Sequence, residues 1–264
     1  MNEIMLHLIF AQVLGAGVAH ETWNGPNGTL HVIRVQPVRA AAVRPVVAPS
    51  GRLALTALAK GGVAAINGGY FDPQTAGAVS YVVQDGRIVS DPTLNRRLMD
   101  NPSLRPYLGA IGARTEWRLL SGNAGCRWQL APHGSDMPVG WTLRHALQAG
   151  PRLLPDDTST LEAFLRPGRD AINAGGSSAR SGLGLTKAGE LLLVMSPDGQ
   201  PLADFGRSLR QMGCVEAMAL DGGSSSQLAW HDATGWHVVG PAGRKPGADG
   251  SLVGLVSALV VGDL

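Results

Sequence analysis

The sequence has little charge and no long apolar run. Only 16% of its 264 residues are charged, and 22 Lys and Arg nearly balance 20 Asp and Glu, for a formal net charge of +2. Such a balance gives no electrostatic reason to expect a nucleic-acid partner. The scarcity of charge also argues against coiled coils and long solvent-exposed helices. Because no apolar run reaches the roughly 18 residues that span a bilayer, the sequence predicts no transmembrane anchor.

Several widespread catalytic motifs are missing as well. The sequence contains no G-x-S-x-G elbow, no G-x-x-x-x-G-K-[ST] loop, no G-x-G-x-x-G and no H-E-x-x-H. These absences disfavour serine α/β-hydrolases, P-loop NTPases, dinucleotide oxidoreductases and zincins. His231 and His237 are expected to flank a surface hairpin, with metal binding as the less favoured interpretation. The sequence indicates no required cofactor and leaves the need for a divalent metal open.

Residues 6–19 form an apolar segment, LHLIFAQVLGAGVA, of the length of a signal-peptide core. Gly17-Val18-Ala19 has the small-x-small pattern of a cleavage site, but the preceding MNEIM lacks the basic residues of a signal peptide. One interpretation is therefore a signal peptide over 1–19 followed by a single domain over 20–264. The other is a buried N-terminal helix or strand. The two cysteines, Cys126 and Cys214, are compatible with one disulfide or with two buried thiols.

The chain is rich in turn-forming residues, with 36 Gly and 17 Pro, although 44% of its residues are hydrophobic. Short apolar segments between turns predict an α+β fold, with a mixed, largely antiparallel twisted sheet and flanking helices. Hairpins are predicted around Asp85-Gly86 and Ala188-Gly189. Helices are expected over 51–60, 142–148 and 202–213.

A short pattern recurs in the two halves of the chain. A shift of 154 residues aligns Asn67-Gly68-Gly69 with Asp221-Gly222-Gly223, and each follows an expected helix and a short apolar strand. The pattern suggests two pseudo-repeated halves, although coincidence explains so short a match as well. If the repeat is real, two strand ends in one sheet bring an amide and a carboxylate to a shared cleft.

The most informative motif is the run Asp221-Gly222-Gly223-Ser224-Ser225-Ser226. A carboxylate that follows a buried strand lies at the rim of its sheet, and two Gly let the backbone present successive N–H groups to an anion. A tight polar turn, in which Asp221 bonds to its own backbone, is the plainer explanation. The pairing with Asn67-Gly68-Gly69 favours a functional site.

Two arginines offer the cation that an anionic ligand requires. Arg180 lies in the Gly/Ser-rich AGGSSARSG segment, near Asn173, and a guanidinium there is suited to a phosphate or a carboxylate. Arg152, in AGPRLL, allows the same interpretation, and a solvated surface position is the alternative for both. Asp72, Glu116 and Glu162 are spare carboxylates that could complete an acid/base pair with Asp221.

Several ordered segments resemble the phosphodiester glycosidase family. They are AINGGYFDP, VVQDGRIVS, AGPRLL, SARSGLGLTKAGELLLV, LADFGRSLRQMG and AMALDGGSSSQL, within roughly residues 28 to 262. The resemblance implies hydrolysis of a sugar-1-phosphodiester to free sugar and a phosphomonoester. It also implies a secreted or periplasmic setting and a glycan or cell-envelope substrate, because bacterial relatives are often associated with exopolysaccharide. The sequence departs from the family in ARSGLGLT, where RTAIG is more usual, and at Ser224, where the family has a third Gly.

The resemblance and the chemistry together give one expected site. A phosphate monoester is a good leaving group, so the site needs charge neutralisation for the phosphate and a carboxylate for the anomeric carbon more than it needs a general acid. The expected catalytic residues are Asp221, Asn67 and Arg180, and the expected substrate- or phosphate-binding residues are Gly68, Gly69, Arg152, Asn173, Gly222, Gly223, Ser224 and Ser225. The alternative function is a non-catalytic domain that binds an anionic glycan or peptidoglycan.

Overall fold

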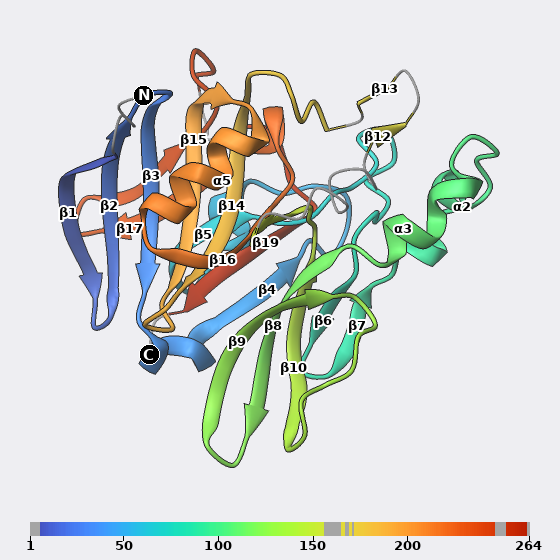
Figure 1. The fold of residues 1–264 in the computed structure, drawn as a ribbon, viewed down its shortest axis with the longest axis horizontal. Coiled ribbons are helices and arrows are strands. Elements are labelled where there is room, and N and C mark those ends of the chain that lie inside the picture. The colour runs from blue at the N-terminus through green and yellow to red at the C-terminus, as the bar shows by residue number, and fades with distance from the viewer. Residues whose placement is uncertain (1–5, 156–164, 167–168, 171, 246–251, 263–264) are drawn as a thin grey trace.

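The computed structural model describes residues 6–155, 165–166, 169–170, 172–245 and 252–262. Antiparallel strands dominate this part of the chain (Figure 1). The first sheet has the order β1 (His7–Gly15), β2 (Val18–Gly25), β3 (Gly28–Val35), β15 (Leu191–Gln200), β14 (Ser178–Thr186), β16 (Cys214–Ala219), β11 (Arg152–Leu154). The second has the order β7 (Arg87–Ser90), β6 (Val82–Gln84), β10 (Trp141–Gln148), β8 (Thr115–Gly122), β9 (Gly125–Pro132).

The third sheet has the order β18 (Gly235–Val239), β17 (Leu228–Asp232), β5 (Gly62–Asn67), β19 (Ser257–Gly262), β4 (Val43–Val47). A small hairpin pairs β12 (Leu165–Arg166) with β13 (Arg169–Asp170). The α-helices of the described residues are α1 (Leu55–Leu58), α2 (Arg96–Met99), α3 (Leu108–Gly112) and α5 (Leu202–Gln211). Short 3-10 turns are η1 (Pro37–Ala42), η2 (Pro92–Leu94), η3 (Arg105–Tyr107) and η4 (Gly223–Ser225).

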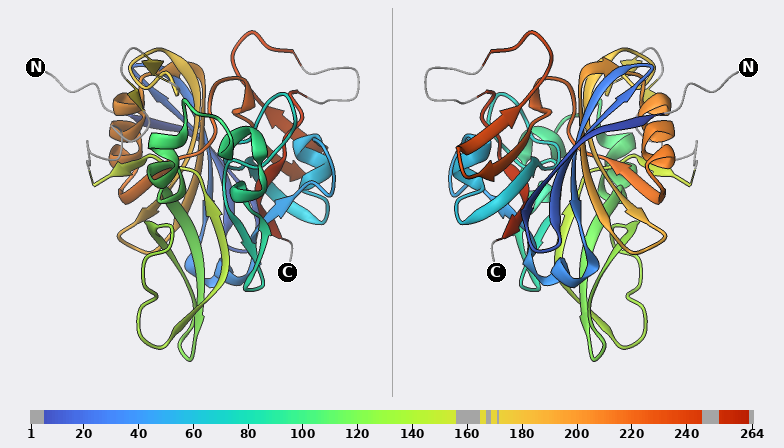
Figure 2. Two further views of the ribbon diagram at one scale, coloured as in Figure 1. Left: turned by 90° about the vertical axis from the view of Figure 1, so that its right-hand side faces the viewer. Right: turned by 90° about the vertical axis from the view of Figure 1, so that its left-hand side faces the viewer.

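The main core lies between the sheets and draws buried side chains from all three of them. Helix α5 covers the opposite face of the first sheet, where Phe205 and Leu209 are fully buried against β3, β15 and β16 (Figures 1 and 2). Two small residues in β14 make this close approach possible. A Cβ at Gly182 would lie 2.7 Å from the Phe205 ring, and one at Gly184 would lie 2.5 Å from Cys214 Sγ. The short helix α1 covers the outer face of the third sheet in the same way.

Much of the predicted local structure is confirmed. The hairpins at Asp85-Gly86 and Ala188-Gly189 join β6 to β7 and β14 to β15. The predicted helix over 202–213 is α5, and the apolar strands before Asn67 and Asp221 are β5 and β16. Cys126 and Cys214 are both free thiols.

Other predictions need correction. The fold is mainly β, with few and short helices, rather than a sheet flanked by substantial ones. The segment 142–148 is part of strand β10, because pairing with β6 and β8 fixes it in an extended conformation and overrides its local helical pattern. The helix expected over 51–60 is reduced to the single turn α1. The recurring strands β5 and β16 lie in different sheets, so the expectation that one sheet carries both strand ends is wrong.

The apolar segment 6–19 contributes the edge strand β1, which pairs antiparallel with β2. Leu8, Ile9 and Phe10 are about half exposed on this strand, and Val13 is 79% exposed. Removal of residues 1–19 as a signal peptide stays a prediction. Such cleavage would leave β2 as the edge of the first sheet.

Candidate functional site

The carboxyl ends of β5 and β16 meet where the first and third sheets adjoin. Asn67, at the end of β5, is completely buried, and its Nδ2 donates to the Asp221 carbonyl at 2.8 Å. Its Oδ1 accepts from the backbone N–H of Gln227 at 3.0 Å. The Asp221 N–H in turn donates to the Gly68 carbonyl at 3.1 Å. The paired motifs are therefore in direct contact, although they belong to two sheets.

This junction requires glycine at positions 68 and 69, because the neighbouring atoms leave no room for a side chain there. A Cβ on Gly68 would lie 2.2 Å from Ser257 Oγ, and one on Gly69 would lie 2.2 Å from the Gln148 carbonyl oxygen. Both residues are buried, and neither lines the cavity described next. Close packing therefore accounts for glycine at both positions.

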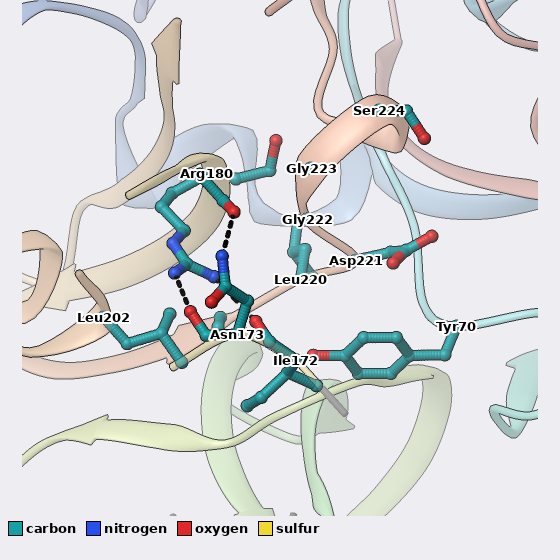
Figure 3. A pocket seen from close by; sticks show the side chains of 13 residues that line it. Tyr70, Ile172, Asn173, Arg180, Leu202, Leu220, Asp221, Gly222, Gly223 and Ser224 are labelled. Atoms are coloured by element: carbon teal, nitrogen blue, oxygen red, sulfur yellow. Dashed lines mark hydrogen bonds between the residues drawn. The ribbon is translucent and has the colours of Figure 1, made fainter. Parts of the chain in front are cut away.

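A cavity of about 320 Å³ opens beside the junction (Figure 3). This volume is at the lower end of the roughly 300–1,000 Å³ of small-molecule sites. In Figure 3, Arg180 and Asn173 lie on one side of the cavity, and Asp221 and Tyr70 lie on the other. Its lining residues are Tyr70, Ile172, Asn173, Ser178, Arg180, Ser181, Leu202, Ala219, Leu220, Asp221, Gly222, Gly223 and Ser224.

Asp221 carries the one carboxylate among the described residues that line the cavity. Burial raises the pKa of this carboxyl from 3.8 to about 7. Hydrogen bonds from the Ser225 hydroxyl and the Gly222 N–H, together with the charge of Arg114, act in the opposite direction. A group with its pKa near neutrality can exchange a proton at physiological pH, which is the usual requirement for general acid–base chemistry.

Tyr70 and Arg114 support the Asp221 side of the cavity. The Tyr70 hydroxyl donates to the Gly150 carbonyl at 2.9 Å, and the Arg114 guanidinium carbon lies 5.0 Å from the centre of the Tyr70 ring. Burial, reinforced by the negative charge of Asp221, raises the pKa of the Tyr70 hydroxyl. Burial lowers the pKa of Arg114 to about 10, so the guanidinium stays protonated at neutral pH and contributes a positive charge near Asp221.

Arg180 is 3% exposed and ties the opposite wall together. Its Nε donates to the Gln200 carbonyl at 2.7 Å, and its Nη1 donates to the Ile172 carbonyl at 3.0 Å. Its Nη2 donates to the carbonyls of Asn173 and Gly176 at 2.5 and 2.9 Å. The same side chain therefore places a positive charge in the cavity wall and fixes the loop that carries Asn173.

Serine hydroxyls around the cavity differ in what they bind. Ser225 is buried and bonds to the Asp221 carboxylate, so it positions that group. Ser224 is exposed at the cavity rim. Ser181 is 1% exposed, and its Oγ has no hydrogen-bond partner in the part of the chain that the structure describes. An unpartnered buried hydroxyl in a cavity wall is costly unless a ligand or water satisfies it.

Asp221, Arg180, Asn173, Gly222, Gly223 and Ser224 all line the cavity as expected from the sequence, whereas Arg152 does not. The Arg152 guanidinium forms an ion pair with Glu216, and its Nη1 donates to the Leu130 carbonyl at 3.2 Å. Arg152 therefore binds other parts of the chain and does not line the cavity.

The spare carboxylates do not join Asp221. Asp72 pairs with Arg97 at 2.7 Å, and Glu116 pairs with both Arg118 and His133 at 2.7 Å. Glu162 lies outside the described residues.

Sequence reasoning missed Tyr70 and Arg114, and it matched Ser181 to the Arg motif of the family without including it among the expected site residues. Tyr70 directly follows the Asn67-Gly68-Gly69 motif, and Ser181 follows Arg180, so both had a usable signal in their neighbours. Arg114 lies far from either motif in sequence, and no local pattern marks it.

Neither a cluster of metal ligands nor a membrane-spanning helix occurs among the described residues. No group of three or more His, Cys, Asp or Glu side chains placed for a metal ion occurs among the described residues. His237 instead pairs with Asp232 at 2.9 Å in the β17–β18 hairpin. Across the same residues, every helix is too short or too polar to cross a membrane.

Comparisons with known proteins show the family and the fold of this chain. The sequence profile of the phosphodiester glycosidase family matches residues 60–254. That range contains both strand ends and every residue that lines the cavity. A search of curated proteins gives no significant match.

Three solved structures share the fold at low identity. The catalytic domain of zebrafish N-acetylglucosamine-1-phosphodiester alpha-N-acetylglucosaminidase, auto-inhibited by its pro-peptide, superposes with a TM-score of 0.69 at 16% identity, over 100% of this chain and 85% of its own. A hypothetical protein from Synechocystis gives 0.64 at 16% identity, over 95% of this chain and 63% of its own, so this chain spans less than two thirds of that relative. A Burkholderia pseudomallei K96243 protein labelled as exported gives 0.53 at 14% identity, over 92% and 74%.

Proposed function

Because this chain belongs to the phosphodiester glycosidase family, we propose that it hydrolyses glycosyl phosphodiesters. In the proposed reaction, water supplies the oxygen that joins the anomeric carbon of the sugar. The bond between that carbon and the phosphate oxygen breaks, and the bonding electrons leave with the phosphate. The products are a free sugar and a phosphomonoester. One hydrogen of the water stays on the new sugar hydroxyl, and the other is released as a proton to the phosphate or to solvent.

The observation that carries the proposal is the placement of Asp221. Its carboxyl lies in a cavity whose walls also hold the Arg180 guanidinium, Gly222 and Gly223. An anionic phosphate suits the positive charge of Arg180, and a carboxylate suits the positive charge that develops at the anomeric carbon. Asp221 acts as the nucleophile or as the base for water, because a phosphate leaving group needs little help from a general acid.

The other residues have supporting roles. Arg180 provides electrostatic stabilisation of the phosphate, and Asn173, Ser181 and Ser224 offer polar groups at the cavity wall. Asn67 holds the two strand ends together through backbone groups, so we assign it a positioning role in place of the catalytic role expected from the sequence.

The family suggests a class of substrate, and one relative suggests a location for the protein. We propose that the substrate is a carbohydrate phosphodiester of a glycan or of the cell envelope, and that the protein acts after export. The export of this chain is supported by the apolar segment 6–19 and by the Burkholderia relative labelled as exported.

The direct test is hydrolysis of a panel of sugar-1-phosphodiesters, including α-N-acetylglucosamine-1-phospho-methyl-mannoside, in water enriched in ¹⁸O. We expect release of free sugar with ¹⁸O in the sugar, and a loss of about 10³-fold or more in the Asp221→Asn variant. Asp136→Asn, at an exposed carboxylate away from the cavity, serves as the matched control and should retain full activity. Incorporation of ¹⁸O into the phosphate would instead show cleavage of the phosphorus–oxygen bond, which would contradict the proposed glycosidase reaction. Binding of these diesters without turnover would support the glycan-binding alternative.

A further inference from the structure

A second hollow, of about 470 Å³, adjoins the proposed active-site cavity. The two share Ser178, Gly223 and Ser224 in their walls, so a ligand that fills the first can continue into the second. A phosphodiester has two arms, and a cavity of about 320 Å³ has room for the sugar and the phosphate but little more. The second arm, the aglycone, has to leave the cavity through a neighbouring opening.

The far wall of this groove is a turn over residues 241–244. The Ala242 N–H donates to the Pro197 carbonyl at 3.0 Å, which anchors the turn to β15. The Arg244 N–H donates to the Pro241 carbonyl at 3.1 Å and closes the turn. Arg244 is therefore held on a fixed piece of backbone, with its side chain exposed along the groove.

The groove is lined by small uncharged residues and by one cationic side chain. Ala179, Pro241, Ala242 and Gly243 give a smooth wall, and Arg244 is the charged member of the lining. Of the described residues that line the groove, none is acidic. An anionic aglycone meets an attractive charge there, and no carboxylate repels it.

We propose that this groove binds the aglycone of the substrate and that Arg244 selects an aglycone with a second anionic group, a phosphate or a carboxylate. The inference rests on the proposed function and narrows its substrate class to glycosyl phosphodiesters that continue into a charged chain. A polymer with repeated phosphodiesters and a glycan with acidic sugars share this chemistry. The groove is open along its length, so the aglycone can extend beyond Arg244.

A matched pair of substrates tests the proposal. The neutral one is α-N-acetylglucosamine-1-phospho-hexanediol, and the anionic one carries a phosphate on the distal hydroxyl of the same hexanediol. We expect the parent protein to hydrolyse the anionic substrate with a kcat/KM about 3- to 10-fold higher at low ionic strength. Arg244→Gln should reduce that ratio to about 1. Arg96→Gln, at an exposed arginine in α2, should keep the parent ratio.

A binding measurement separates this inference from the proposed function. Calorimetric titration of the Asp221→Asn protein with the two diesters reports binding without turnover, and the anionic compound should bind more tightly by the same factor. If both compounds bind equally, or if Arg244→Gln retains the preference, the aglycone assignment is overturned even when hydrolysis is observed. If neither is hydrolysed by the parent but the charge-dependent binding persists, the groove assignment stands and the catalytic proposal fails. Phosphate- and carboxylate-bearing hexanediol derivatives distinguish the two anions.

Discussion

Two opposing influences act on the ionisation of the Asp221 carboxyl. Burial disfavours its charged form, whereas Ser225, Gly222 and Arg114 stabilise that form. The balance leaves the pKa at about 7 rather than at the 3.8 of an unperturbed carboxyl. Because the carboxyl is half protonated near neutrality, small changes in its surroundings alter the fraction that is active.

The first prediction concerns the pH dependence of activity and stability at Asp221. A nucleophile or base must be ionised, so kcat/KM should rise with pH and level off above about 7. Removal of the Arg114 charge in Arg114→Met should move the inflection to higher pH, because that charge lowers the pKa of Asp221. A profile that falls through pH 7 would instead identify Asp221 as a general acid.

The same shift predicts an effect on folding. Between pH 3.8 and 7 the folded state holds a proton at Asp221 that the unfolded chain releases, so this group disfavours folding increasingly as pH rises. Asp221→Asn should therefore stabilise the protein relative to the parent at pH 8 by on the order of 1–3 kcal/mol, and by less at pH 5. Urea denaturation at the two pH values measures the difference, and an equal effect at both would contradict the raised pKa.

A second prediction concerns the Ser181 hydroxyl. Because its Oγ has no partner among the described residues, Ser181→Ala should leave the free energy of unfolding unchanged or slightly higher. If the hydroxyl binds substrate, the same variant should lower kcat/KM by about 10-fold, which corresponds to one hydrogen bond. Ser196→Ala is a suitable control, since that buried hydroxyl also has no described partner but does not line the cavity. If the two variants have equal kcat/KM, Ser181 does not bind the substrate.

At the scale of elements, the site depends on how closely the loop after β5 packs against the end of β10. The Gln148 carbonyl at the end of β10 occupies the space where a side chain on residue 69 would lie. A Cβ there would also approach Ser80 Cβ to 2.6 Å. The second sheet therefore supports the loop that carries Tyr70, although that loop belongs to the third.

The third prediction tests this packing with a single methyl group. Gly69→Ala should destabilise the protein by about 1–3 kcal/mol or more, because the backbone of Gln148 cannot easily move away. Gly109→Ala in α3 is the control, since a Cβ at that position meets nothing within 4 Å. Thermal unfolding of both variants measures the effect. Similar melting temperatures for the two would show that the loop adapts.

The sequence was informative where a local pattern and a tertiary role coincide. The sequence predicts Asp221 and Arg180 as site residues from their Gly/Ser-rich surroundings and from the family resemblance, and both line the cavity. Residues 142–148 were predicted as helix, because the partners that hold them extended, β6 and β8, are distant in sequence. Arg114 was missed for the same reason: its relation to Asp221 exists only after the second sheet packs against the other two.

At the scale of the whole molecule, stacked rings join the first and third sheets. His20 on β2 stacks on Trp230 of β17 with ring centroids 3.8 Å apart, and its Nε2 lies 3.2 Å from His31 Nδ1 on β3. Burial, together with the nearby His31 and His237, lowers the pKa of His20 from 6.5 to about 4, whereas Glu21 acts in the opposite direction. Burial also lowers the pKa of His31, against the opposing charge of Asp198.

The fourth prediction concerns the contribution of His20 to stability in mild acid. Between pH 6.5 and 4 the unfolded chain binds a proton at His20 that the folded state excludes, so the contribution of His20 to the free energy of unfolding should fall as pH decreases, opposite in sign to the contribution of Asp221. The contribution of His20 is on the order of 1–3 kcal/mol. His20→Phe should therefore gain stability relative to the parent as pH decreases, and His7→Asn, at an exposed histidine, should not. Urea midpoints at pH 4.5 and 7 provide the measurement, and His31→Gln gives a second variant should His20→Phe fold poorly.

The junction at Asn67 has a consequence for substitutions at the two positions that it joins. Its amide bonds to the main chain of Asp221 and Gln227, and main-chain atoms are the same whatever residue occupies a position. These two hydrogen bonds therefore do not depend on the side chains at positions 221 and 227. A variant such as Asp221→Asn can change the chemistry of the cavity while the joint between the first and third sheets stays in place.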